Sequence, residues 1–130
     1  MDMKFTTSIP IYLQIMDEIK RQIATGVLKP GDKLPSQREL AAQLKVNANT
    51  VQRAYREMEM LGLVETLRGQ GTFVRRCQAI VEETRRELLS RLVDDFACAM
   101  RSLGFDRGEA LELVRSAFER IEAGEGVEEK

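Results

Sequence analysis

Two polar breaks divide the first sixty residues into three short amphipathic segments, and this spacing constrains the fold more than any other feature of the chain. The first break contains Pro30 and Gly31, a pair that strongly favours a turn. The second break, Lys45 to Asn47, is so short that the chain must turn sharply there. This order predicts a helix-turn-helix, a motif that presents the start of its last helix to the major groove of DNA.

The first segment has the pattern of one helix face. Isoleucine recurs at every fourth position from Ile11 to Ile23, with Pro10 at the expected start and Gly26 at the expected end. These signals predict a helix between the proline and the glycine.

The second and third segments carry capping signals at their starts. Ser36 and Glu39 have the spacing of a capping box, and Asn47 is a favourable N-cap for a helix that ends at Gly62. The apolar stripe expected on this third helix contains Val51, Ala54, Tyr55, Met58 and Leu61. The opposite face carries Asn49, Arg53 and Arg56.

A short hairpin is predicted after the third helix. Residues 63–66 and 72–74 have the composition of strands, and the tip between them, Arg68-Gly69-Gln70-Gly71, has two glycines that tolerate positive φ. A hairpin in this place corresponds to the wing of a winged helix-turn-helix.

The remaining chain predicts two helices. The apolar stripe of residues 80–103 is long, the segment 103–105 breaks it, and Asp106 with Glu109 forms a second capping box. Two helices bury little surface, so we expect residues 77–123 to pair with a second copy as a homodimer. The acidic tail from Gly124 is expected to fray.

The fold class expected is therefore mainly α with a small β-hairpin wing. A winged helix-turn-helix DNA-binding domain occupies residues 1–76, and a two-helix C-terminal dimerisation domain occupies residues 77–130.

Charge is distributed unevenly between these two parts. Residues 1–76 hold 12 Lys and Arg against 8 Asp and Glu, whereas residues 77–130 hold 8 against 13. The basic first part is the one suited to a polyanion. No apolar run approaches the ~20 residues of a membrane span and no signal peptide is recognisable, so a cytoplasmic location without a membrane partner is expected.

The composition disfavours an enzyme. Histidine is absent, and Cys77 and Cys98 lack the spacing of a metal site, so neither a metal nor a cofactor nor catalysis is expected. A disulfide is not expected in the cytoplasm. The segment Gly69–Gly71 lacks the Lys-Ser/Thr of a phosphate-binding loop.

The segment LKPGDKLPSQRELA, residues 28–41, closely resembles the opening of GntR-family bacterial transcription regulators. The likeness continues through residues 46–59, 62–64 and 68–74, and it covers residues 9–75 in all. The short two-helix tail is similar to that of the YtrA subfamily. The resemblance implies a winged helix-turn-helix that binds DNA.

The resemblance also implies which residues contact DNA. Family contact positions are occupied by Arg38, Asn47, Asn49, Thr50, Arg68 and Gly69. Ala48 and Gln52 stand where some members carry arginine, so the base preference of those members is not transferred.

The residue types suit base reading. The Asn49 amide is able to pair with adenine, and the Thr50 methyl is able to contact a thymine methyl. Gln52 either reads adenine or is an ordinary surface residue.

Four arginines are further candidates. Arg38 and Arg68 are expected at a phosphate, a base edge or the narrow groove. Arg53 and Arg56 are expected to contact DNA, although each has a glutamate three or four residues on, with which a surface pair would form. The aromatic residues Tyr12, Tyr55 and Phe73 are expected to be structural rather than to stack on bases.

The predicted function is a sequence-specific transcriptional regulator, most simply a repressor, that binds an inverted-repeat operator in double-stranded DNA as a homodimer. The alternative is a winged helix that docks proteins, which requires an apolar patch on the third helix. A pocket at the dimer interface for an unidentified small-molecule effector is left open.

Overall fold

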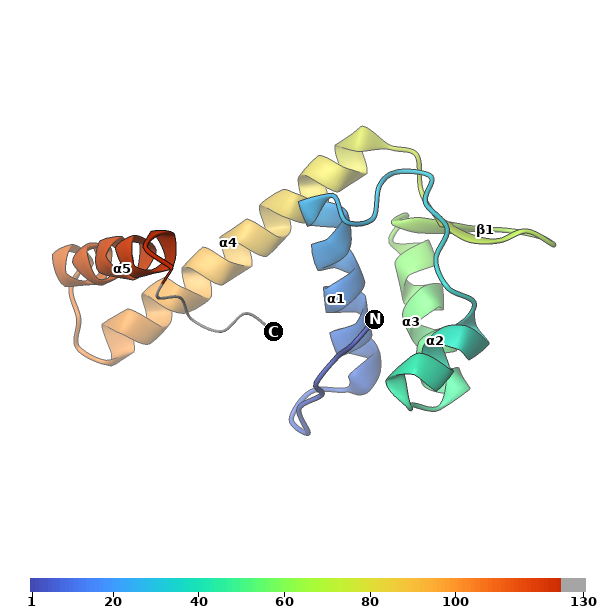
Figure 1. The fold of residues 1–130 in the computed structure, drawn as a ribbon, viewed down its shortest axis with the longest axis horizontal. Helices are drawn as coiled ribbons and strands as arrows, with labels where there is room; N and C mark the ends of the chain where they lie inside the picture. Colours follow the sequence, from blue (N-terminus) through green and yellow to red (C-terminus); the bar gives the residue numbers. More distant parts are fainter. Residues whose placement is uncertain (125–130) are drawn as a thin grey trace. The chain divides into compact units, whose positions relative to one another are not determined.

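The computed structural model of the protein describes residues 1–124, and these residues form five helices and one β-hairpin (Figure 1). The chain divides into two compact units, the first spanning Met1–Leu88 and the second beginning at Leu89. No helix within the described range is long and apolar enough to cross a membrane.

The first unit contains three helices followed by the hairpin. The helices are α1 (Ile11–Thr25), α2 (Gln37–Leu44) and α3 (Ala48–Met60), and the antiparallel strands are β1 (Val64–Leu67) and β2 (Gly71–Val74). Helix α3 packs against α1, α2 and β1, and the hairpin projects beyond the helices (Figure 1). This arrangement is the predicted winged helix-turn-helix.

Local capping explains where α2 and α3 begin. The Ser36 hydroxyl accepts a hydrogen bond from the Glu39 N–H at 3.1 Å, and the Glu39 carboxylate accepts one from the Ser36 N–H at 3.3 Å. The Asn47 side chain accepts from the Asn49 N–H at 2.8 Å. Between the two helices, Lys45 adopts a left-handed conformation with φ of 57°, which makes the sharp turn. Both predicted caps are confirmed.

The core of the first unit lies between the three helices and the base of the hairpin. Its completely buried side chains include Ile15, Ile19, Leu40, Val51 and Met58. The prediction that Leu61 belongs to the buried apolar stripe of α3 is wrong, because α3 ends at Met60 and Leu61 is 58% exposed. The chain turns there, and Leu63 is buried in its place.

The wing differs from the prediction in two respects. Strand β1 begins one residue later than expected, and β2 begins at Gly71, which the sequence pattern had assigned to the tip. The loop before α2 also lies along β2, because the Leu34 N–H bonds the Thr72 carbonyl and the Val74 N–H bonds the Asp32 carbonyl. This loop therefore attaches the wing to the start of α2.

Helix α4 (Gln78–Ser102) begins within the first unit. Ile80 and Val81 pack against the core there, and Thr84 is buried with its hydroxyl donating to the Ile80 carbonyl at 2.8 Å.

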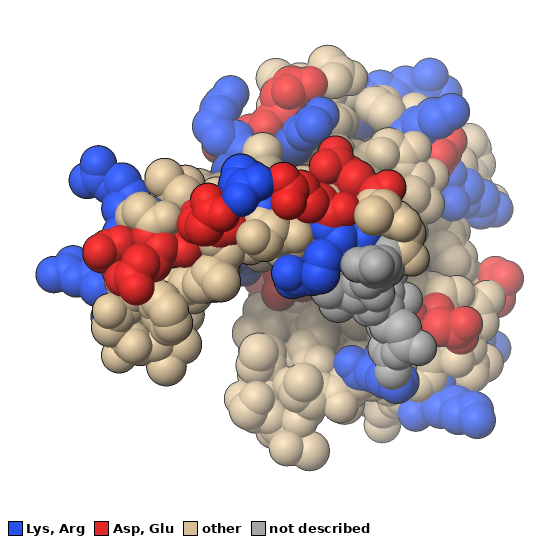
Figure 2. Space-filling model, turned by 60° about the vertical axis from the view of Figure 1, so that its left-hand side comes forward, with Lys and Arg blue, Asp and Glu red and all other residues tan. Residues whose placement is uncertain are grey.

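The second unit consists of the rest of α4 and helix α5 (Arg107–Glu122). The predicted break is confirmed: Gly104 has φ of 88°, and Asp106 and Glu109 form the second capping box. No apolar residue from Leu89 to Gly124 is buried in the single chain. Acidic and basic side chains are interspersed on the face of the molecule that is turned toward the viewer in Figure 2. The predicted frayed tail beyond Gly124 lies outside the described residues.

A buried phenol links α3 to the loop before α2. The Tyr55 hydroxyl donates to the Pro35 carbonyl at 2.6 Å, and burial, followed by the nearby Glu39 charge, raises the pKa of Tyr55 above its ordinary value of 10. The unfolded chain therefore ionises first, so this phenol's contribution to stability is complete below pH 10 and is lost as the pH rises further.

We expect Tyr55→Phe to lower stability at pH 7 by about 1–2 kcal/mol, because the Pro35 carbonyl loses its donor. Above pH 10 the difference between the variant and the wild type should shrink by up to about 1.4 kcal/mol per pH unit. Urea unfolding at pH 7 to 11 measures both effects, and a difference that stays constant across this range would contradict the account.

Candidate nucleic-acid interface

Helix α3 has one buried and one exposed side, as predicted. Val51, Ala54 and Met58 are completely buried, and the opposite side exposes Asn49, Gln52, Arg53 and Arg56. We call these four exposed residues the outer face of α3. The helix thus presents amide and guanidinium groups to solvent along its first two turns, the chemistry that reads base edges and binds phosphates.

The first residues of α3 combine capping with exposure. Asn47 is exposed, but its side-chain oxygen is occupied by the Asn49 N–H. Thr50 is half-buried at the same end. Asn47 therefore has a structural function in addition to any contact with DNA, whereas the Asn49 side chain has no hydrogen bond to the described residues.

A groove of about 600 Å³ separates α2 from the hairpin. Its lining includes Arg38 from α2, Arg68 and Gly69 from the tip, and Lys33 from the loop between α1 and α2. We call it the wing groove. It collects cationic side chains from three segments that are up to 35 residues apart, so it is a surface on which a phosphate chain fits.

Lys33 is a candidate that the sequence pattern did not identify. It is exposed and pairs with Phe73 in an isolated antiparallel bridge. A Cβ on Gly71 would lie 2.8 Å from the Lys33 Cε, so the lysine side chain crosses the strand close to this glycine. The single clue in the sequence was a basic residue directly before Leu34-Pro35, and its meaning depends on the bridge to β2.

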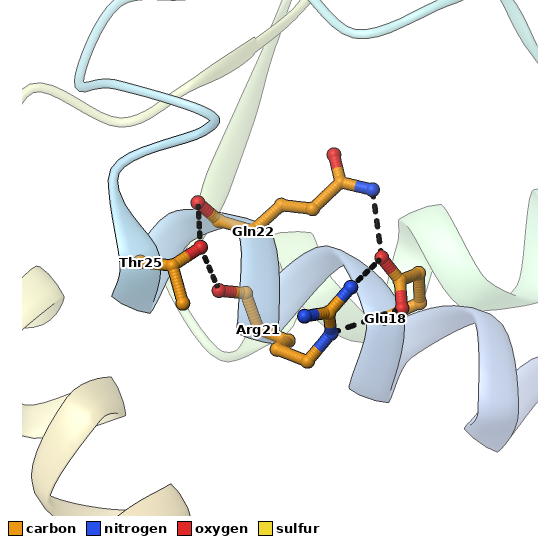
Figure 3. A network of polar contacts seen from close by, with 4 residues as sticks. All are labelled: Glu18, Arg21, Gln22 and Thr25. Atoms are coloured by element: carbon orange, nitrogen blue, oxygen red, sulfur yellow. Dashed lines mark hydrogen bonds and ion pairs between the residues drawn. The ribbon is translucent and has the colours of Figure 1, made fainter. Parts of the chain in front are cut away.

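Two arginines away from these surfaces, Arg21 and Arg115, are held in local ion pairs. In α1 the Arg21 guanidinium donates to the Glu18 carboxylate at 3.1 and 3.2 Å, Gln22 donates to the same carboxylate, and Thr25 bonds the Arg21 carbonyl (Figure 3). Burial opposes ionisation of Glu18, but the Arg21 and Gln22 hydrogen bonds outweigh it and hold the pKa below its ordinary value.

In α5, Arg115 pairs with Glu112 and Glu119. By contrast, Arg38, Arg56 and Arg68 form no hydrogen bond or ion pair with any residue of the described chain. These three arginines lie on α2, α3 and the wing tip, so their charges are available to an anionic partner.

Arg53 has an unexpected neighbour. Its guanidinium carbon lies 3.9 Å from the centroid of the Tyr12 ring, and its Nη2 donates to the Tyr12 hydroxyl at 3.3 Å. The alternative pair with Glu57 is absent, as is a pair between Arg56 and Glu59, within residues 1–124. Sequence reasoning expected Tyr12 only to be structural and did not foresee this contact.

The three aromatic residues lie in structural positions. Tyr12 is half-buried beneath Arg53, Tyr55 is buried with its hydroxyl bonded, and Phe73 is half-buried in β2. Cys77 and Cys98 are free thiols. In the part of the chain that the structure describes, no three acidic or cysteine side chains converge on a point that would hold a metal ion.

The family model for bacterial regulatory proteins of the gntR family matches residues 11–74. The chain is 49% identical over 119 residues to the uncharacterized HTH-type transcriptional regulator YhcF of Bacillus subtilis, covering 92% of this chain and 98% of that protein. It is 53% identical over 68 residues to the HTH-type transcriptional repressor YtrA of the same organism, covering 52% of each.

Solved structures agree with these relatives. A GntR family transcriptional regulator from Listeria monocytogenes superposes with a TM-score of 0.81 at 37% identity, covering 86% of this chain and 98% of that one. The DNA-binding domain of AraR in complex with operator ORX1 superposes with a TM-score of 0.52 at 29% identity, covering 57% of this chain and 94% of that one. The relatives are transcriptional regulators rather than enzymes. The chain is therefore a DNA-binding transcriptional regulator of the YtrA-like kind, and it belongs to the GntR family.

Proposed function

We propose that this protein is a repressor that binds an inverted-repeat operator as a homodimer. The observation that carries the proposal is the outer face of α3, which presents two amides and two guanidiniums, together with the wing groove, which contains three further cations. In this proposal residues 1–76 bind DNA and residues 77–130 form the dimer. The outer face of α3 enters the major groove, and the wing groove follows the adjacent phosphates.

The proposed contact residues divide by chemistry. Asn49, Thr50 and Gln52 read base edges, because their groups pair with adenine or contact a thymine methyl. The phosphate contacts come from the exposed cations and the wing tip: Lys33, Arg38, Arg53, Arg56, Arg68 and Gly69. Asn47 sets the start of α3 and thereby the position of the base-reading residues.

The dimer is proposed from the apolar surface of the second unit. Between α4 and α5 lies a hollow of about 630 Å³ that is lined by Val93, Phe96, Met100, Phe105 and Leu111, among others. Large apolar side chains that remain exposed on the same two helices include Leu89, Leu92 and Phe118. A surface so rich in exposed apolar groups is typical of an interface, and a second copy covers both equivalent surfaces at once.

Repression is proposed because the similar protein YtrA is a transcriptional repressor by name, and operator binding because AraR is solved on operator DNA. The test is to select duplexes from a random pool with the full chain and to measure the mass of the complex. Enriched inverted repeats bound by two chains are the expected result. A protein that binds no duplex in a saturable, salt-sensitive manner is instead a docking module, and the proposal fails.

Substituting Arg38 or Lys33 by alanine should weaken binding to all duplexes and lower the slope of log K against log salt by about one unit, because each removes one phosphate contact. Gel shifts at several KCl concentrations measure the slope. Arg115→Ala is the control, since this arginine lies on α5 and is paired with glutamates. If the salt slope is unchanged in both Arg38→Ala and Lys33→Ala, the wing groove does not contact DNA phosphates.

A further inference from the structure

Tyr12 and Arg53 join the start of α1 to the outer face of α3. The guanidinium lies 3.9 Å above the tyrosine ring and also donates to the tyrosine hydroxyl at 3.3 Å. We propose that Tyr12 is a positioning residue of the DNA-binding surface, which holds the Arg53 guanidinium ready to bind a DNA backbone phosphate. This inference rests on the proposed function and adds a residue of α1 to it.

The geometry leaves Arg53 able to bind an anion. A guanidinium has five N–H donors, and only one of them is directed at the Tyr12 hydroxyl. The ring covers one face of the planar group, whereas hydrogen bonds to a phosphate lie in its plane. Arg53 also remains exposed and forms no ion pair within residues 1–124. Tyr12 therefore restrains the side chain without consuming its charge.

The restraint favours binding for an entropic reason. A free arginine side chain samples many rotamers, and ordering it at an interface opposes association. The stacked ring and the hydroxyl bond restrict these rotamers before DNA arrives. Tyr12 itself is half-buried against the core, so it is a firm support for the arginine.

The position of the pair favours a phosphate over a base. Helices α1 and α3 pack together, and the contact with Tyr12 draws the guanidinium toward the edge of α3 that borders α1. When α3 lies in the major groove, its edges face the two sugar–phosphate backbones and its outermost ridge faces the bases. An arginine at the edge is therefore placed at the backbone.

The test compares the full-length wild type with Tyr12→Leu, Tyr12→Phe, Arg53→Ala and the double variant Tyr12→Leu/Arg53→Ala. The probes are a duplex selected by the wild type and an unrelated duplex of equal length. Arg53→Ala should weaken both complexes about tenfold at 0.1 M salt and lower the salt slope by about one unit. Tyr12→Leu should weaken both about threefold with Arg53 present, and Tyr12→Phe should fall between it and the wild type.

The decisive result is the double variant. If Tyr12 acts through Arg53, adding Tyr12→Leu to Arg53→Ala causes no further loss of affinity. A pair that only joins α1 to α3 would instead lower the melting temperature in both single variants and leave the affinity of folded protein unchanged, which overturns the inference. Circular dichroism melts establish that each variant is folded, and Arg120→Ala on α5 is the charge-matched control.

Two other results would also reject the inference that Tyr12 positions Arg53. Tighter binding by Tyr12→Leu would show that the ring withholds the arginine from DNA. An effect of Arg53→Ala on the selected duplex alone would assign Arg53 to a base. If the selection yields no duplex that the wild type binds, the proposed function fails, whereas wild-type binding with an unaffected Arg53→Ala variant rejects only this inference.

Discussion

Replacing Phe96 by aspartate should convert the protein to a monomer and weaken its binding to an inverted-repeat operator about a hundredfold or more. Phe96 lines the hollow between α4 and α5, and its residue is 42% exposed in the single chain. If a second copy covers this surface, the substitution places an unpaired carboxylate in an apolar interface, which strongly opposes association. Each monomer would then bind one half-site without help from the other.

Two measurements separate the steps of this argument. Light scattering after gel filtration gives the mass of the free protein, and gel shifts give its affinity for one half-site and for the complete operator. The variant should keep its half-site affinity and lose only the gain from the second half-site. Ser90→Asp adds the same charge at an exposed polar position of α4 and should remain dimeric. A dimeric Phe96→Asp variant would show that the interface lies elsewhere.

Replacing Ile19 by alanine should lower the free energy of unfolding of the first unit by about 3 kcal/mol. Ile19 is completely buried on the α1 stripe, and α1 packs against α3. Truncation removes apolar contacts and leaves a cavity between the helices. Because folded proteins are stable by only about 5–15 kcal/mol, a loss of this size also lowers the fraction of DNA-binding protein at elevated temperature.

Urea unfolding followed by circular dichroism measures this loss. Ile19→Val should lose only about 1 kcal/mol, since the smaller side chain removes a single methyl group. Leu13→Ala on the same helix is an exposed control, because Leu13 is 38% exposed, and it should change stability by less than either core substitution. If Ile19→Ala and Leu13→Ala lower the free energy of unfolding equally, the buried stripe of α1 does not contribute more to stability than its exposed side.

The features predicted correctly from the sequence depend on neighbours in the chain. The two capping boxes each join residues three positions apart, and the α1 stripe repeats at intervals of four. Such patterns can be recognised in a sequence because hydrogen bonds and burial along a helix repeat every three to four residues. The prediction for Leu61 was wrong for a related reason. Its spacing continues the apolar stripe of α3 in the sequence, but the helix itself ends at Met60.

The features that were missed depend on residues far apart in the chain. Lys33 obtains its place from a bridge to Phe73, forty residues later in the chain. The contact between Tyr12 and Arg53 joins residues 41 positions apart. No local periodicity encodes either pairing, because each depends on how two separately formed elements dock.

By itself, the sequence determined the order of the helices, the hairpin and the polar side of α3, since caps, turns and helical periodicity act over a few residues. Only the tertiary structure decided which cations gather in the wing groove and which arginine lies on a tyrosine. Those placements arise when α1, α2, α3 and β2 bury their apolar sides against one another, and burial brings together surface groups that the chain keeps apart.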